Sequence, residues 1–126
     1  PMASGFFALL DDVAALATGA VLAACDAGKL AIGVDTDQAL SLPEYSAAIL
    51  TSAEKRIDVA VLEVIQKNAG GDLGGENYVG TLANKGVKLS AYHDFDSQIS
   101  AELKAEVDAL AAEIAAGTVK ITDYFK

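Results

Sequence analysis

Two aspartates, Asp35 and Asp37, follow the apolar run at residues 30–34 and are the best candidates in this chain for binding a ligand. A carboxylate accepts two hydroxyl hydrogen bonds well, so an aspartate at a strand end suits the neighbouring hydroxyls of a sugar. In open α/β sheets, ligands bind at the carboxyl ends of the strands. The alternative is a turn in which Asp37 accepts hydrogen bonds from nearby backbone N–H groups. The spacing brings no further carboxylate or histidine to the pair, which disfavours a metal site.

Lys55 is the third candidate for a binding residue. Thr51 and Glu54 have the spacing of a helix capping box, which predicts a helix that begins here and places Lys55 in its first turn. A cation in the first turn opposes the helix dipole, and this local conflict favours a binding role. The alternatives are a solvated surface lysine, or a lysine that pairs with Glu54 or Asp58.

The residues best known for catalysis give little support to an enzyme. His93 lies in the segment HDFD, but no nucleophile can be matched to it by spacing, so we expect no catalytic residue and no cofactor. Cys25 is the only cysteine, which excludes an intrachain disulfide, and its place at the end of an apolar helix favours a buried, inert thiol.

The segment VLAAC, residues 21–25, resembles the lipid-attachment box of bacterial lipoproteins. A secretory signal needs a basic start followed by an uninterrupted apolar stretch. No Lys or Arg precedes Cys25, and Asp11 and Asp12 interrupt the apolar residues. We therefore interpret this stretch as an ordinary amphipathic helix rather than an export signal or an anchor.

The bulk properties exclude some classes of function. A chain of 126 residues suggests one domain, and a net charge of −9 argues against binding to a nucleic-acid backbone. No apolar run reaches the roughly 18 residues of a transmembrane helix, so we expect no membrane insertion.

The apolar pattern predicts alternating helices and strands, and hence a layered α/β/α domain with a mostly parallel sheet. The first predicted elements are a helix from Phe6 to Ala24 that stops at Gly28, a buried parallel strand at 30–34 and a loop at 39–45. A strand at 47–50 and a helix from the capping box to about Asn68 follow, and then extended segments at 78–82 and 87–92 around a turn at 84–86. The last predicted elements are a helix from Ile99 to Ile114 that stops at Gly117 and a strand at 119–121.

Three blocks of the chain carry a family resemblance: AGKLAIGVDTDQ, ILTSAEKRIDVAV and the segment that starts NYVGTLANKGVKLSAYHDFD. Together they resemble the C-terminal lobe of the basic membrane lipoprotein family, the purine nucleoside receptors of ABC transporters. The resemblance covers about residues 18–121. It implies one lobe of a periplasmic binding protein fold, in which two lobes clamp a nucleoside. It also implies that a ligand-binding aspartate lies in the GVDTDQ block, for which we take Asp35, and that Lys55 binds ligand.

The chain departs from the family in its first 17 residues, for which we expect a divergent N-terminal helix, and residues 10–19 keep only Thr18 and Gly19 of the family's Gly-rich turn. The other lobe is absent from the sequence, and Pro1 before Met2 is typical of a cloning remnant. We therefore expect a single domain over residues 1–126 that binds a purine nucleoside weakly or only as a homodimer. The alternative is a vestigial, non-binding α/β domain that oligomerises. The family works outside the cytoplasm, yet no export signal is seen, so the sequence leaves the compartment open.

Overall fold

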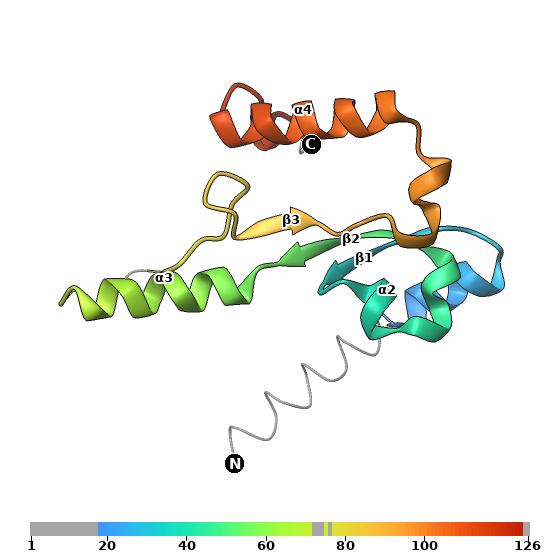
Figure 1. The fold of residues 1–126 in the computed structure, drawn as a ribbon, viewed down its shortest axis with the longest axis horizontal. Helices are drawn as coiled ribbons and strands as arrows, with labels where there is room; N and C mark the ends of the chain where they lie inside the picture. The colour runs from blue at the N-terminus through green and yellow to red at the C-terminus, as the bar shows by residue number, and fades with distance from the viewer. Residues whose placement is uncertain (1–17, 72–74, 76, 125–126) are drawn as a thin grey trace, which may run out of the picture. The chain divides into compact units, whose positions relative to one another are not determined.

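The computed structural model describes residues 18–71, 75 and 77–124. Residues 18–26 are helical, and the elements that follow alternate between strands and helices (Figure 1). In chain order they are β1 (Ala31–Asp35), α2 (Gln38–Ser41), the 3₁₀ helix η1 (Pro43–Ala48), β2 (Ile49–Lys55), α3 (Ile57–Ala69), β3 (Val87–Leu89), the 3₁₀ helix η2 (His93–Gln98), α4 (Ala101–Ala116) and the 3₁₀ helix η3 (Ile121–Tyr124).

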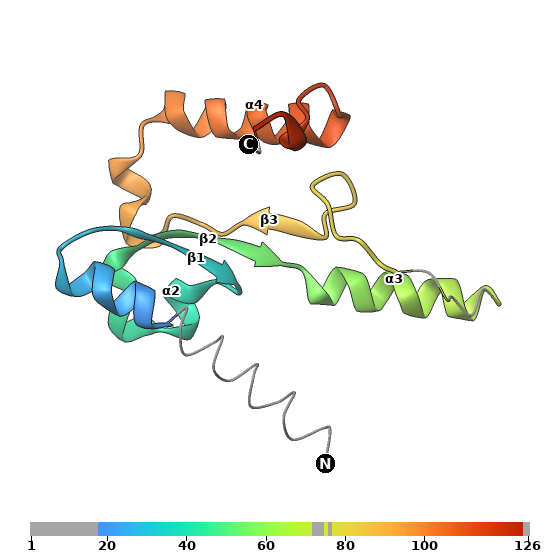
Figure 2. The same ribbon diagram turned by 180° about the vertical axis from the view of Figure 1, so that it is seen from behind.

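The three strands form one small sheet in the order β1-β2-β3 (Figure 2). β1 and β2 are parallel, and Gly33 pairs in register with Ser52. β3 runs the other way, since the N–H of Ser90 bonds to the carbonyl of Ser52 and the N–H of Arg56 bonds to the carbonyl of Gly86. The predicted α/β class is confirmed, and the sheet is mixed.

The chain divides into two compact units. The first unit holds residues up to 54 together with 89–96, and the second holds residues 55–88 and the chain from 97 onward. In the first unit the buried side chains of Val21, Ala39 and Ile49 form a small apolar core. Partly buried side chains pack against this core from β1, from η1 and from the residue between α2 and η1: Ala31, Tyr45 and Leu42. The expectation of a single domain stays a prediction.

Both predicted glycine stops are confirmed. Gly28 ends the first helix with a φ of 62°, and Gly117 ends α4 with a φ of 75°. This left-handed conformation costs glycine little because it lacks a Cβ. The N–H of Lys29 then bonds back to the carbonyl of Ala24, which satisfies the end of the helix. The predicted start of that helix, from residue 6 to residue 17, lies outside the described residues.

The capping-box prediction was wrong. Thr51 and Glu54 lie inside β2, and α3 begins only at Ile57, after its N-cap residue Arg56, without a side-chain cap. The Thr51 hydroxyl instead donates to the carbonyl of Ser90 on the neighbouring chain segment. The short polar side chains that would cap a helix thus bond across the sheet.

Four other local predictions were also wrong. The expected loop at 39–45 forms α2 and η1, where Pro43 starts the 3₁₀ turn with its fixed φ. The segment 78–82 is not a strand, because the Asn84 side chain accepts from Thr81 N–H and donates to the Val79 carbonyl. The segment 119–121 is not a strand, because the N–H of Val119 bonds back to Glu113 in α4 and Ile121 begins η3. β1 is parallel as predicted but not buried, because Ile32 on its outer face is exposed.

Candidate functional site

The candidate site lies in the first unit, at the carboxyl end of β1. Asp35 is the last residue of the strand, pairs in register with Glu54 of β2, and is exposed. Its φ of 72° is a conformation that non-glycine residues adopt rarely and aspartate more readily than most. The chain turns sharply here, so that the residues after β1 fold back onto the sheet. The structure thus places Asp35 at the strand end, where the sequence predicts it.

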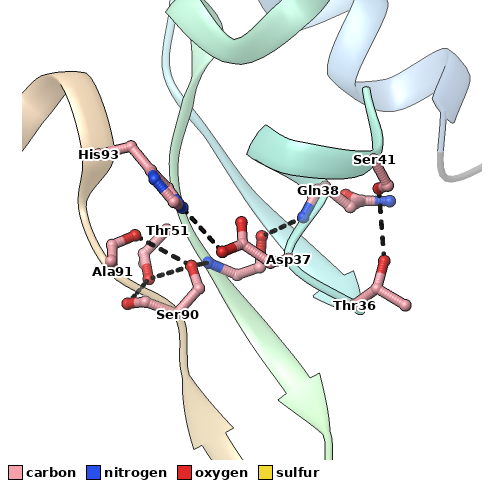
Figure 3. A network of polar contacts seen from close by, with 9 residues as sticks. Thr36, Asp37, Gln38, Ser41, Thr51, Ser90, Ala91 and His93 are labelled. Atoms are coloured by element: carbon pink, nitrogen blue, oxygen red, sulfur yellow. Dashed lines mark hydrogen bonds and ion pairs between the residues drawn. The ribbon is translucent and has the colours of Figure 1, made fainter. Parts of the chain in front are cut away.

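Asp37 has a partner that the sequence did not predict (Figure 3). Its Oδ2 accepts a hydrogen bond from Nε2 of His93, which lies 56 residues later in the chain, over a distance of 2.7 Å. The side chains of His93 and Asp37 are 27% and 18% exposed. The second oxygen, Asp37 Oδ1, is buried and has no hydrogen-bond partner in the described part of the chain. The Asp37 side chain does not cap α2, so the alternative interpretation as a local turn acceptor was wrong.

Serine hydroxyl groups fix the two chain segments that carry Asp37 and His93. Ser52 Oγ accepts the N–H of Gln38, the residue that follows Asp37, at 3.0 Å. On the other side, Ser90 Oγ accepts the N–H of Ser52 at 2.8 Å and donates to the carbonyl of Ala91. These bonds connect β2 to the start of α2 and to the segment before η2 (Figure 3). The Asp37–His93 pair is therefore supported from both directions.

The site is closely packed around Gly33, and its backbone is strained at His93. A Cβ at Gly33 would lie 2.7 Å from Oε1 of Gln38 and closer still to Oγ of Ser52, so β1 needs glycine here for lack of space. His93 adopts a φ of 44°, the second positive φ at the site after that of Asp35. Residues held in such conformations store strain, and in proteins they gather at functional sites.

Lys55 is not at the start of a helix. It is the last residue of β2, is exposed, and belongs to the second unit. The conflict with a helix dipole, on which its predicted role depended, is therefore absent. Its part in binding now depends on the family resemblance alone.

Arg56, the next residue, forms a bidentate ion pair with Asp58 in the first turn of α3. Nε of Arg56 donates to Oδ1 at 2.8 Å and the terminal nitrogen donates to Oδ2 at 2.6 Å. These hydrogen bonds lower the pKa of Asp58 to about 2. The pair is exposed and fixes the start of the helix, where the acidic side chain also suits the helix dipole.

The side chains at the site are held by hydrogen bonds. The Ser90 hydroxyl donates to a backbone carbonyl, and the Ser52 hydroxyl accepts a backbone N–H, so these bonds serve the backbone. Within the described ranges, no group of three or more His, Cys, Asp or Glu side chains could hold a metal ion. Likewise, none of the described helices combines the length and apolar character needed to cross a bilayer.

Sequence reasoning identified Asp35 and Asp37 but missed His93 as the partner of Asp37. It also missed the hydroxyl groups of Ser52 and Ser90. One signal for them was present: Thr51 and Ser52 are polar residues next to an apolar run, and such residues in a strand need partners across the sheet. No protein-family model matches this chain, and no curated protein matches it.

Proposed function

We propose that this chain is a solute-binding lobe that takes a purine nucleoside or a similar hydroxyl-bearing ligand. One observation carries the proposal. Asp35 is exposed at the carboxyl end of the parallel strand β1, the place where α/β sheets bind ligands. The resemblance of the GVDTDQ block to the nucleoside receptors supports the choice of ligand. The layered arrangement and the likeness to a periplasmic binding protein lobe belong to the same proposal.

In this function Asp35 accepts hydrogen bonds from the paired hydroxyls of the ribose, and Asp37 shapes the turn beside it. The hydrogen bond between Asp37 and His93 keeps that turn in place while a ligand binds. Lys55 is proposed as a second ligand contact. If two lobes together give about −12 kcal/mol, one lobe with half of the contacts gives about −6 kcal/mol, which is a Kd of tens of micromolar.

Titration calorimetry with guanosine, adenosine and inosine tests the proposal. We expect weak binding of at least one nucleoside and a large loss of binding in Asp35→Asn. Asparagine suits this variant because it tolerates positive φ, removes the charge and replaces one acceptor oxygen with an NH2 donor. Lys55→Ala should also weaken binding. The matched controls are Asp108→Asn and Lys120→Ala, which change exposed side chains of the second unit. Binding that survives Asp35→Asn unchanged would refute the site.

A second candidate function is a non-binding domain that oligomerises. It is favoured by the large apolar side chains left exposed on α3, which recur at helical spacing: Ile57, Val61, Val64 and Ile65. Exposed apolar side chains in such a row are typical of a protein–protein contact. If no nucleoside gives heat in calorimetry and the chain still self-associates, this second function is the better one.

A further inference from the structure

We propose that β1 is a homodimer interface, on which the β1 strand of a second copy of this chain adds in antiparallel orientation about a two-fold axis at Ile32. β1 is the first strand in the order β1-β2-β3, so among the described strands it has a neighbour on one side only. An edge strand presents backbone N–H and C=O groups that a further strand can pair with. This inference does not depend on nucleoside binding.

The outer face of β1 is apolar and exposed. Leu30 directly before β1, and Ile32 and Val34 within it, stand at alternate positions and are 52%, 66% and 44% exposed. Alternate residues of a strand share a face, so the three side chains form one row. The opposite face of the strand carries Ala31, which packs against the core of the first unit. A row of this kind on an edge strand needs a covering surface.

The sequence of the strand is complementary to itself. With Ile32 facing its own copy, Leu30 faces Val34 of the second copy, and the apolar row continues across the interface. Lys29 then faces Asp35 of the second copy, once at each end of the paired strands. Both residues are exposed and carry opposite charges. This charge match is what identifies the occupant as a second copy, because a two-fold contact requires a patch that fits itself.

One backbone group at this edge is already hydrogen-bonded to a side chain of the same chain. The N–H of Val34 donates to Oε1 of Gln38 over a long distance of 3.3 Å. In the dimer, the carbonyl of Leu30 from the second copy would take this N–H, and the Gln38 side chain would move aside. Since backbone groups two residues apart point to the same side of a strand, Ile32 also presents its N–H and C=O outward. Gln38 therefore limits the affinity of the dimer.

Sedimentation velocity without nucleoside, up to about 1 mM chain, is the first test, because a small interface of this kind is weak. We expect a concentration-dependent dimer that Ile32→Lys abolishes, since it places two like charges on the axis. Val79→Lys is the matched control, because Val79 is 67% exposed and lies in the other unit. A monomer throughout, a dimer unchanged by Ile32→Lys, or an equal loss in Val79→Lys would each overturn the proposal.

Charge exchange tests the register. Lys29→Glu and Asp35→Lys should each raise the Kd of the dimer about fivefold or more, because like charges then face each other at both ends. The double variant should restore the wild-type Kd. Lysine at positive φ has a precedent in this chain at Lys85, whose φ is 59°. Failure of the double variant to restore the dimer would overturn the register with Ile32 at the centre.

A cross-link gives an independent readout. With Cys25→Ala as background, Ile32→Cys should form a disulfide-linked dimer under diamide, because directly opposite residues of a hydrogen-bonded pair have Cα atoms about 5.5 Å apart, a separation that a disulfide spans. Val79→Cys in the same background should stay largely monomeric. Gln38→Ala should lower the Kd of the wild-type dimer. Equal cross-linking at both positions, or a weaker dimer in Gln38→Ala, would contradict the proposed interface.

Discussion

Gly33 is the position at which one added methyl group should disturb the candidate site most. A Cβ there would lie 2.7 Å from Oε1 and 3.0 Å from Cβ of Gln38, and closer still to Oγ of Ser52. The end of the Gln38 side chain can swing away. The Ser52 hydroxyl is fully buried and accepts the N–H of Gln38, so its rotation breaks that hydrogen bond.

The expected cost of Gly33→Ala follows from these two effects. Overpacking of a close contact costs about 1–3 kcal/mol, and the lost hydrogen bond costs about 1 kcal/mol more. The free energy of unfolding should therefore fall by about 2–4 kcal/mol. In urea, with a slope of about 1–3 kcal/mol per molar, the midpoint should fall by about 1 M or more.

A double-mutant cycle tests whether Ser52 is the cause. In a Ser52→Ala background the hydroxyl is absent, so Gly33→Ala should cost at least about 1 kcal/mol less than in the wild type. Gly19→Ala is the control, because Gly19 is helical and, among the described residues outside its own helical backbone, nothing lies within 4 Å of its added Cβ. That substitution should stabilise the chain by up to about 1 kcal/mol. Equal costs of Gly33→Ala in both backgrounds would refute the reasoning.

Three further substitutions or conditions have defined outcomes. His93→Phe leaves the half-buried Asp37 carboxylate without its partner and should lower the free energy of unfolding by about 1–2 kcal/mol, seen as a lower urea midpoint. The pKa of Asp58 is lowered to about 2 in the folded state. Its ion pair with Arg56 therefore stabilises the folded state at pH values above the unfolded pKa near 4, and this stabilisation is lost as the pH falls towards 2. A carboxylate titration by NMR should show this low pKa and its rise in Arg56→Gln; an Asp58 that titrates near 4 in the wild type would contradict it. Ser100→Ala removes the side chain that caps the start of α4 and should cost about 1 kcal/mol, whereas no loss of helix stability would show that the cap is unimportant.

The sequence by itself determined the helices that have clear stop signals and the position of the candidate carboxylates. Gly28 and Gly117 were recognisable because few other residues tolerate the left-handed conformation that ends a helix. Asp35 was recognisable because a polar residue directly after an apolar run marks a strand end. These are local properties, so they can be read without knowing what lies nearby in space.

Only the tertiary structure decided the partners of the polar residues. Thr51 and Glu54 have the spacing of a helix cap, yet both lie in β2. The Thr51 hydroxyl bonds across the sheet to the carbonyl of Ser90, and the Ser52 hydroxyl accepts the N–H of Gln38 at the start of α2. The pairing of Asp37 with His93 joins residues 56 positions apart, and no local pattern contains that distance. The exposure of Ile32 was also hidden from the sequence, since a short apolar run looks the same whether one or both faces of its strand are covered.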